Sequence, residues 1–222
     1  MDFLTLKQLV RQGEGQYVEF KLKANHPEKI VREMIAFANS QGGGWLLLGV
    51  DDDRTIKGVK YPYEDEYVMS KAIAEYAYPV LKYRLVRVSL EEYKEREVLA
   101  FYIPKSKEVS YFKESDNEKY GKAYIRVKDK CLKASYEMWE ILKRQAKQSG
   151  TPFQYGEKER VLLQYLANNK QITVEEFSRN AQISRTMASR CLVTLVVAKV
   201  ITIYPQENGV DYFQYNLDNL VE

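Results

Sequence analysis

Histidine and cysteine are scarce in this chain of 222 residues, and their scarcity excludes several kinds of site. His26 is the single histidine, and Cys131 and Cys191 are the two cysteines. Zinc fingers, HExxH metalloprotease helices and Ser-His-Asp triads all need more of these residues than the chain offers. Two cysteines so far apart in the sequence do not make a disulfide framework either.

Long apolar runs and a phosphate-binding loop are also missing. No run approaches the ~20 apolar residues of a membrane helix, and the charged start MDFLTLKQLVRQ lacks a signal-peptide core. We therefore expect a soluble cytoplasmic protein that does not contact a membrane. Gly42–Gly44 lacks the Lys-Ser/Thr of a GxxxxGK[ST] loop, so it predicts a tight helix-to-strand turn and not an ATP site.

A strong charge of one sign is absent as well. The net charge is +3 over the whole chain. Residues 151–222 hold 7 basic and 8 acidic residues, so the small positive excess lies in residues 1–150. A surface for an anionic partner is therefore expected to be weak, and to lie in the first part of the chain.

The stretch from Gly13 to Gly58 organises the first part of the chain. Alternation predicts a strand over Tyr17–Lys21, and the helical spacing of apolar residues predicts a helix over Pro27–Ser40. A short apolar run then predicts a buried strand over Trp45–Val50, which ends in three aspartates. Such a strand–helix–strand unit could bring Glu14, Glu19 and Asp51 or Asp52 together.

Four short motifs in this stretch resemble the Schlafen AlbA_2 family. They are Glu14, Glu-Phe-Lys at 19–21, Ala-Phe-Ala-Asn-Ser at 36–40, and Gly-Gly followed by Leu-Gly-Val-Asp-Asp. The resemblance covers roughly the first two thirds of the chain, and Ala123–Val127 resembles the family's late strand. It implies a mixed-sheet nucleic-acid-binding domain, which we assign to residues 1–150.

The resemblance also implies roles for the acidic residues. Glu14, Glu19 and an aspartate match three acids that bind metal in the nuclease branch of Schlafen proteins; the spacing favours Asp52, and Asp51 remains a candidate. In a nuclease these acids would be catalytic and would hold Mg²⁺ or Mn²⁺. Lys21 could neutralise a phosphate beside them. Alternatively, Glu19 and Lys21 form a surface ion pair, and Asp51–Asp53 form a polar hairpin turn.

The segment Lys105–Lys133 combines basic residues with interleaved tyrosines. Such a mixture suits a phosphate backbone and exposed bases. We therefore take Lys113, Lys122 and Arg126 as candidate nucleic-acid contacts. The alternative is a solvated loop beside an edge strand.

The last part of the chain predicts a second domain, residues 151–222, after a linker at 149–152. Helices are expected over Glu157–Ala167, over a short segment from Thr173 to Asn180, and over Arg185–Lys199, with a terminal β-hairpin. This order resembles a winged helix-turn-helix, whose third helix enters the major groove. The residues expected to face DNA are Arg185, Thr186, Ser189 and Arg190. A winged helix used for dimerisation or protein contact is the alternative.

The sequence thus predicts an α+β protein with a mixed-sheet AlbA_2-like domain and a winged helix-turn-helix domain. We expect a nucleic-acid-binding protein that acts as a DNA-binding transcriptional regulator, with DNA preferred over RNA, no cofactor needed for binding, and a homodimer as the assembly. The alternatives are a metal-dependent endoribonuclease or endonuclease and a protein-interaction module. Enzymatic activity is expected only under the first alternative.

Overall fold

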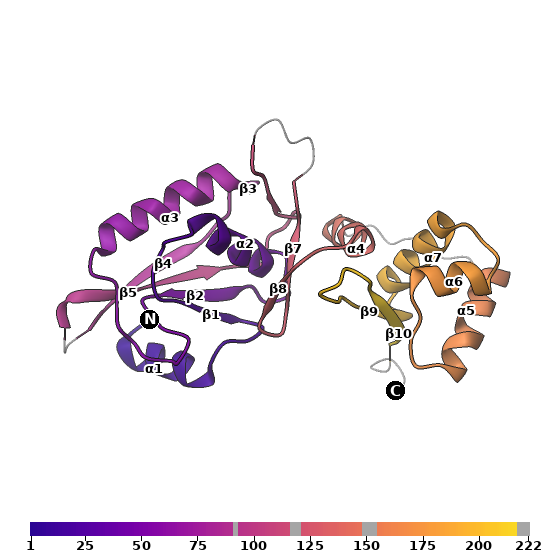
Figure 1. Cartoon of the computed structure of the whole chain (residues 1–222), viewed down its shortest axis with the longest axis horizontal. Helices are drawn as coiled ribbons and strands as arrows, with labels where there is room; N and C mark the ends of the chain where they lie inside the picture. Colours follow the sequence, from indigo (N-terminus) through magenta and orange to yellow (C-terminus); the bar gives the residue numbers. More distant parts are fainter. Residues whose placement is uncertain (91–92, 116–120, 148–154, 217–222) are drawn as a thin grey trace. The chain divides into compact units, whose positions relative to one another are not determined.

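The computed structural model describes residues 1–90, 93–115, 121–147 and 155–216. Two compact units make up the chain, Met1–Lys133 and Ala134–Glu222 (Figure 1). Helices and strands mix in both, and the main sheet is itself mixed, so the expected α+β class is confirmed. None of the helices in the described ranges combines the length and the apolarity that crossing a membrane requires.

The first unit contains three helices and eight strands in the described residues. In chain order they are α1 (Phe3–Gln12), β1 (Val18–Lys21), α2 (Pro27–Ala38), β2 (Gly44–Leu48), α3 (Pro62–Tyr76), β3 (Ala77–Tyr78), β4 (Arg84–Leu90), β5 (Tyr93–Ile103), β6 (Tyr111–Phe112), β7 (Tyr124–Val127) and β8 (Lys130–Lys133).

A four-stranded sheet in the order β1-β2-β5-β4 forms the centre of this unit. β1 and β2 are parallel, as a crossover through α2 requires, and the other neighbours are antiparallel. Strand side chains alternate between faces, so Leu46 and Leu48 pack with α2 and α3, while Leu47 packs with α1. The sheet is therefore covered by α2 and α3 on one face and by α1 on part of the other (Figure 1).

The glycine turn between α2 and β2 confirms the tight connection that the sequence predicts. Gly43 adopts φ +68°, and a Cβ there would lie 2.2 Å from the carbonyl oxygen of Ile103. A Cβ at Gly44 would lie 2.2 Å from the ring of Phe37. The turn therefore serves close packing between α2 and β5, and not a phosphate.

Two short ribbons complete the unit, β3 with β6 and β7 with β8. The side chain of Asn39, just after α2, joins them. Its amide nitrogen donates to the carbonyl oxygens of Ser110 and Tyr124, each at 2.9 Å, and its oxygen accepts from the amide of Ser110 at 2.8 Å. The expected late strand is thereby held against the end of α2, where β7 and α2 pack together.

The second unit contains α4 (Tyr136–Ala146), α5 (Glu157–Asn168), α6 (Val174–Asn180), α7 (Arg185–Val197) and the antiparallel strands β9 (Ile201–Tyr204) and β10 (Tyr212–Tyr215). Thr173 caps α6 through the predicted capping box, and Ser184 caps α7. Leu162, Phe177, Leu192 and Phe213 form the centre of its core.

Helix α4 belongs to the second unit and not to the first. The side chain of Ile141 is 1% exposed and lies in the same core as Leu192. The two units accordingly divide between Lys133 and Ala134, earlier than the boundary at residue 150 that the sequence predicts. The linker expected at 149–152 lies outside the described residues.

Candidate nucleic-acid interface

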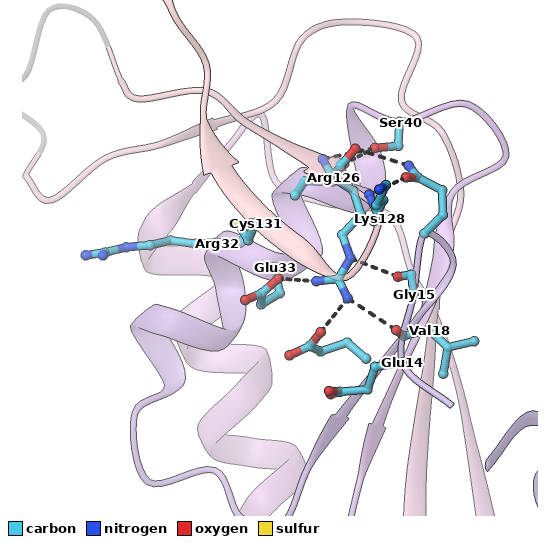
Figure 2. A network of polar contacts seen from close by, with 12 residues as sticks. Glu14, Gly15, Val18, Arg32, Glu33, Ser40, Arg126, Lys128 and Cys131 are labelled. Carbon is cyan, nitrogen blue, oxygen red and sulfur yellow. Dashed lines mark hydrogen bonds and ion pairs between the residues drawn. The ribbon is translucent and has the colours of Figure 1, made fainter. Parts of the chain in front are cut away.

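Arg126 of β7 lies at the centre of a buried polar network (Figure 2). Its side chain is 0% exposed and donates to Glu33 at 2.7 Å and to Glu19 at 2.5 Å. It also donates to the carbonyl oxygens of Gly15 at 3.0 Å and Val18 at 3.3 Å. One guanidinium thus ties the start of β1 to α2 and to β7, three segments far apart in the sequence.

The acids around Arg126 are held by cations and amides of the protein. The second oxygen of Glu19 forms an ion pair with Lys21. Glu14 accepts a hydrogen bond from the amide of Phe20 at 2.9 Å, which satisfies an amide of edge strand β1. Partial burial raises the pKa of Glu14, and the negative charges of Glu19 and Asp52 raise it further. Burial likewise raises the pKa of Glu33, with the charge of Glu19 adding to the effect.

The aspartates after β2 form a polar turn. Asp51 accepts from the amide of Asp52 at 3.0 Å and pairs with Lys57. Asp53 accepts from the amide of Thr55 at 2.8 Å, and Asp52 is exposed. The negative charge of Asp52 contributes to the raised pKa of Glu14.

These acids do not fit a divalent cation. Lys21 and Arg126 pair with the two oxygens of Glu19, so a cation at either oxygen would compete with a positively charged side chain. Across the described ranges, no group of three or more His, Cys, Asp and Glu side chains is placed to hold a metal ion. The arrangement instead neutralises buried carboxylates with an arginine, which is a structural solution.

The basic candidates of the first unit occupy different environments. Arg126 is fully buried, so it cannot contact nucleic acid and leaves the set of expected contacts. Lys21 is 31% exposed and paired with Glu19. Lys122 pairs with Glu114 at 2.8 Å, and the ammonium group of Lys113 lies 4.2 Å from the ring centre of Tyr78. The basic segment therefore offers less free charge than its composition predicts.

The start of α7 presents the candidates of the second unit. Arg185, Thr186 and Arg190 are exposed. Ser189 is 4% exposed, because it points into the helical packing, and it leaves the set of residues expected to face a ligand. The C-terminal half of α7 is buried, since Leu192, Leu195 and their neighbours lie in the core. Only the first turns of the helix are thus open to a partner.

A further cluster on the central sheet escaped the sequence analysis. Trp45 and Tyr102 are paired across β2 and β5, with ring centres 5.0 Å apart. The guanidinium of Arg84 lies 5.7 Å from each ring centre. In the sequence, Trp45 belongs to an apolar run that predicts only a buried strand. Arg84, Val86 and Val88 alternate with residues of the opposite face, and this alternation was the signal that could have placed Arg84 on one face of a strand.

Comparison with known proteins agrees with the resemblance seen in the sequence. Residues 14–135 match the family described as Schlafen, AlbA_2. Among solved structures, the DIP2311 protein from Corynebacterium diphtheriae is similar at 21% identity with a TM-score of 0.41. That similarity covers 59% of this chain and 28% of the other. No protein of curated function matches the chain.

Proposed function

The chain belongs to the Schlafen AlbA_2 family, and we propose that it is a two-domain nucleic-acid-binding protein that acts as a DNA-binding transcriptional regulator. Membership of the family suggests nucleic-acid binding in general. Binding needs no cofactor in this proposal, since the acids beside β1 are neutralised by the protein's own cations. For the same reason we do not assign a nuclease activity to them.

In this proposal the second unit is a winged helix-turn-helix. α6 and α7 are the helix-turn-helix, and β9 with β10 is the wing. The observation that carries the proposal is the exposure of Arg185, Thr186 and Arg190 at the start of α7, beside a C-terminal half that is buried. Recognition helices contact base edges through their N-terminal residues, so these side chains suit the major groove of DNA.

The proposal includes duplex DNA in preference to RNA, and a homodimer. The major groove of an RNA duplex is too deep and narrow for a helix to read. Dimers of helix-turn-helix proteins read two half-sites about one helical turn apart. Sedimentation of the chain with and without a palindromic duplex tests the dimer separately from the affinity.

The test of the second unit is the double variant Arg185→Ala, Arg190→Ala. We expect duplex affinity to fall, and the slope of log K against log salt to decrease by about 0.9 for each lost phosphate contact. Arg160→Ala is the matched control, because Arg160 is an exposed arginine of the same unit whose charge is neutralised by Glu157. Fluorescence anisotropy with a labelled duplex measures both quantities.

The outcome that would overturn this assignment is an unchanged affinity and slope in a double variant that keeps the parent's circular dichroism and melting temperature. The second unit would then be a protein-contact module, as in the alternative interpretation of the sequence. An equal loss of duplex affinity in the double variant and in Arg160→Ala would mean that Arg185 and Arg190 act only through the net charge of the unit.

A further inference from the structure

The register of the central sheet aligns two aromatic rings and an arginine in one row. Trp45 of β2 pairs with Tyr102 of β5, and Tyr102 pairs with Arg84 of β4. Paired residues point to the same face, so the three side chains lie side by side on neighbouring strands about 5 Å apart. The arginine lies within cation–π distance of both rings. We name this cluster the Trp45–Tyr102–Arg84 row.

Helix α1 covers the β1 end of this row: Val18, the β1 partner of Trp45, is 5% exposed in the α1 core, and Trp45 packs against that core. The next row along the strands is Phe20, Leu47, Ala100 and Val86, and it packs with Leu6 and Val10 of α1. In the row itself, Arg84 is exposed, and Trp45 and Tyr102 are partly exposed. Tyr17, which lies against Gly42 at the same end of β2, is 54% exposed. The cluster is therefore a surface at the edge of the α1 core.

In the chain segments that contribute the row, the charged residues are basic, and the acids next to these segments in the sequence are Glu97 and Glu108. Residues 41–48, 79–86 and 98–107 contain no aspartate or glutamate. They contribute the exposed basic residues Lys82, Arg84, Lys105 and Lys107 at this end of the sheet. Among the described residues Arg84 has no carboxylate partner, whereas Arg87 on the opposite face of β4 forms an ion pair with Glu66. An anionic ligand is therefore the chemical complement of this surface.

We propose that the Trp45–Tyr102–Arg84 row binds an unpaired base of single-stranded nucleic acid, and that Arg84 and the neighbouring lysines contact its phosphates. Aromatic rings and guanidinium planes on a sheet surface stack with unpaired bases, and basic residues beside them follow the backbone. Duplex bases are stacked on each other and cannot reach a sheet. The inference rests on the nucleic-acid binding proposed above, but not on the winged helix.

Trp45 makes the proposal directly measurable. The chain has two tryptophans, and Trp139 lies in the second unit. In a full-length Trp139→Phe background, the emission of Trp45 reports on its own surroundings. We expect oligo(dT) and oligo(U) of about twelve nucleotides to quench this emission saturably, because a stacked base quenches a ring that it covers. A hairpin-closed duplex of equal charge is expected to leave it unchanged.

Two arginines of the same strand provide the matched comparison. Arg84→Gln is expected to weaken the binding of the single strand about tenfold and to lower its salt slope by about 0.7. Arg87→Gln is the control, because that arginine already pairs with Glu66 on the other face. Tyr102→Leu keeps an apolar side chain, removes the ring, and should also weaken binding about tenfold. Circular dichroism checks that each variant folds.

Three results would overturn the proposal. One is binding of the single strand, seen by anisotropy, without any quenching of Trp45. Another is an equal effect of Arg84→Gln and Arg87→Gln. Should Trp45 emission change with protein concentration alone, the row would be a protein contact and the proposal would fail. Failure of the Arg185 and Arg190 test would leave single-strand quenching intact, so the two proposals fail separately.

Discussion

Arg126 and Arg84 of the first unit both lie close to aromatic rings but differ in burial and in their acidic partners. Arg126 lies 5.1 Å from the ring centre of Phe37, is fully buried, and contacts two carboxylates. Arg84 lies beside Trp45 and Tyr102, is exposed, and has no carboxylate partner in the described residues. Both are preceded by an aromatic or apolar residue in a short strand, and composition does not distinguish them.

The difference shows that the role of an arginine depends on its neighbouring acids. Glu19 and Glu33 neutralise Arg126, and these ion pairs hold β1, α2 and β7 together. No acid neutralises Arg84 in the described part of the chain, so its charge remains available to a ligand. A comparison of the two residues by substitution should therefore separate stability from binding.

The largest effect is expected for Arg126→Met. Removing the guanidinium leaves Glu33 without its cation and Glu19 with Lys21 alone, and breaking such a buried pair costs about 3–5 kcal/mol. Urea unfolding of the full chain, followed by circular dichroism, measures the loss. Arg87→Met is the control: that arginine is 28% exposed with one acidic partner, so its loss should cost much less than the loss of Arg126.

A second variant tests whether the loss arises from uncompensated charge. Arg126→Met combined with Glu19→Gln and Glu33→Gln should recover most of the stability, because neutral side chains no longer need the cation. If the triple variant is no more stable than Arg126→Met, the loss comes from packing and from the hydrogen bonds to Gly15 and Val18. The electrostatic account of the network would then be wrong.

A smaller effect, with a definite direction in pH, is expected for Glu33→Gln. The pKa of Glu33 is raised in the folded state, chiefly by burial, so the folded state binds this proton more tightly than the unfolded state. The parent therefore loses stability as the pH rises from the pKa of Glu33 in the unfolded state, near 4.5, through its raised pKa in the folded state. The stability of Glu33→Gln relative to the parent should increase over that window and then level off.

Melting temperatures of both proteins between pH 4 and 8 measure this difference. A relative stability that falls with rising pH would mean that the ion pair with Arg126 outweighs the burial of Glu33. The pH range of the test also covers Glu14, whose pKa is raised as well, so Glu14→Gln provides the comparison for an acid outside the ion pairs of Arg126.

Arg84→Met should change stability little. Its partners are the rings of Trp45 and Tyr102, and an exposed cation–π contact contributes only about 0.5–1 kcal/mol, so its unfolding curve should lie close to that of the parent. The same variant should bind a single strand more weakly, since the unneutralised charge is lost. A large loss of stability with unchanged binding would reverse the roles that we assign to Arg84 and Arg126.

The smallest effect is expected for Mn²⁺. Millimolar Mn²⁺ should leave the melting temperature within about 1 °C of its value in EDTA, because a ligand stabilises only a fold that binds it. Structured RNA and DNA should remain uncut under the same conditions. A saturable rise in melting temperature that Glu19→Gln abolishes would show that the cation competes successfully with Lys21 or Arg126, and would restore the nuclease alternative.

The fold of the first unit followed closely from its sequence, whereas its polar network did not. Helical spacing from Pro27 and the short apolar run at Trp45 placed α2 and β2 to within a few residues. In the second unit, the capping box at Thr173 placed α6 in the same way. These signals are local, since periodicity and caps depend on neighbours a few residues away. Ser189, by contrast, is covered by core contacts that no local spacing indicates.

The sequence determined helices α2, α5, α6 and α7, strands β1 and β2, the glycine turn and the family, because each depends on residues close together in the chain. The tertiary structure decided which charges are free. Arg126 is buried and contacts Glu19, which is 107 positions away in the sequence. Arg84 lies beside Tyr102 and Trp45 because of the register of three strands. Burial and pairing depend on distance in space, and long-range contacts between strands and helices set that distance.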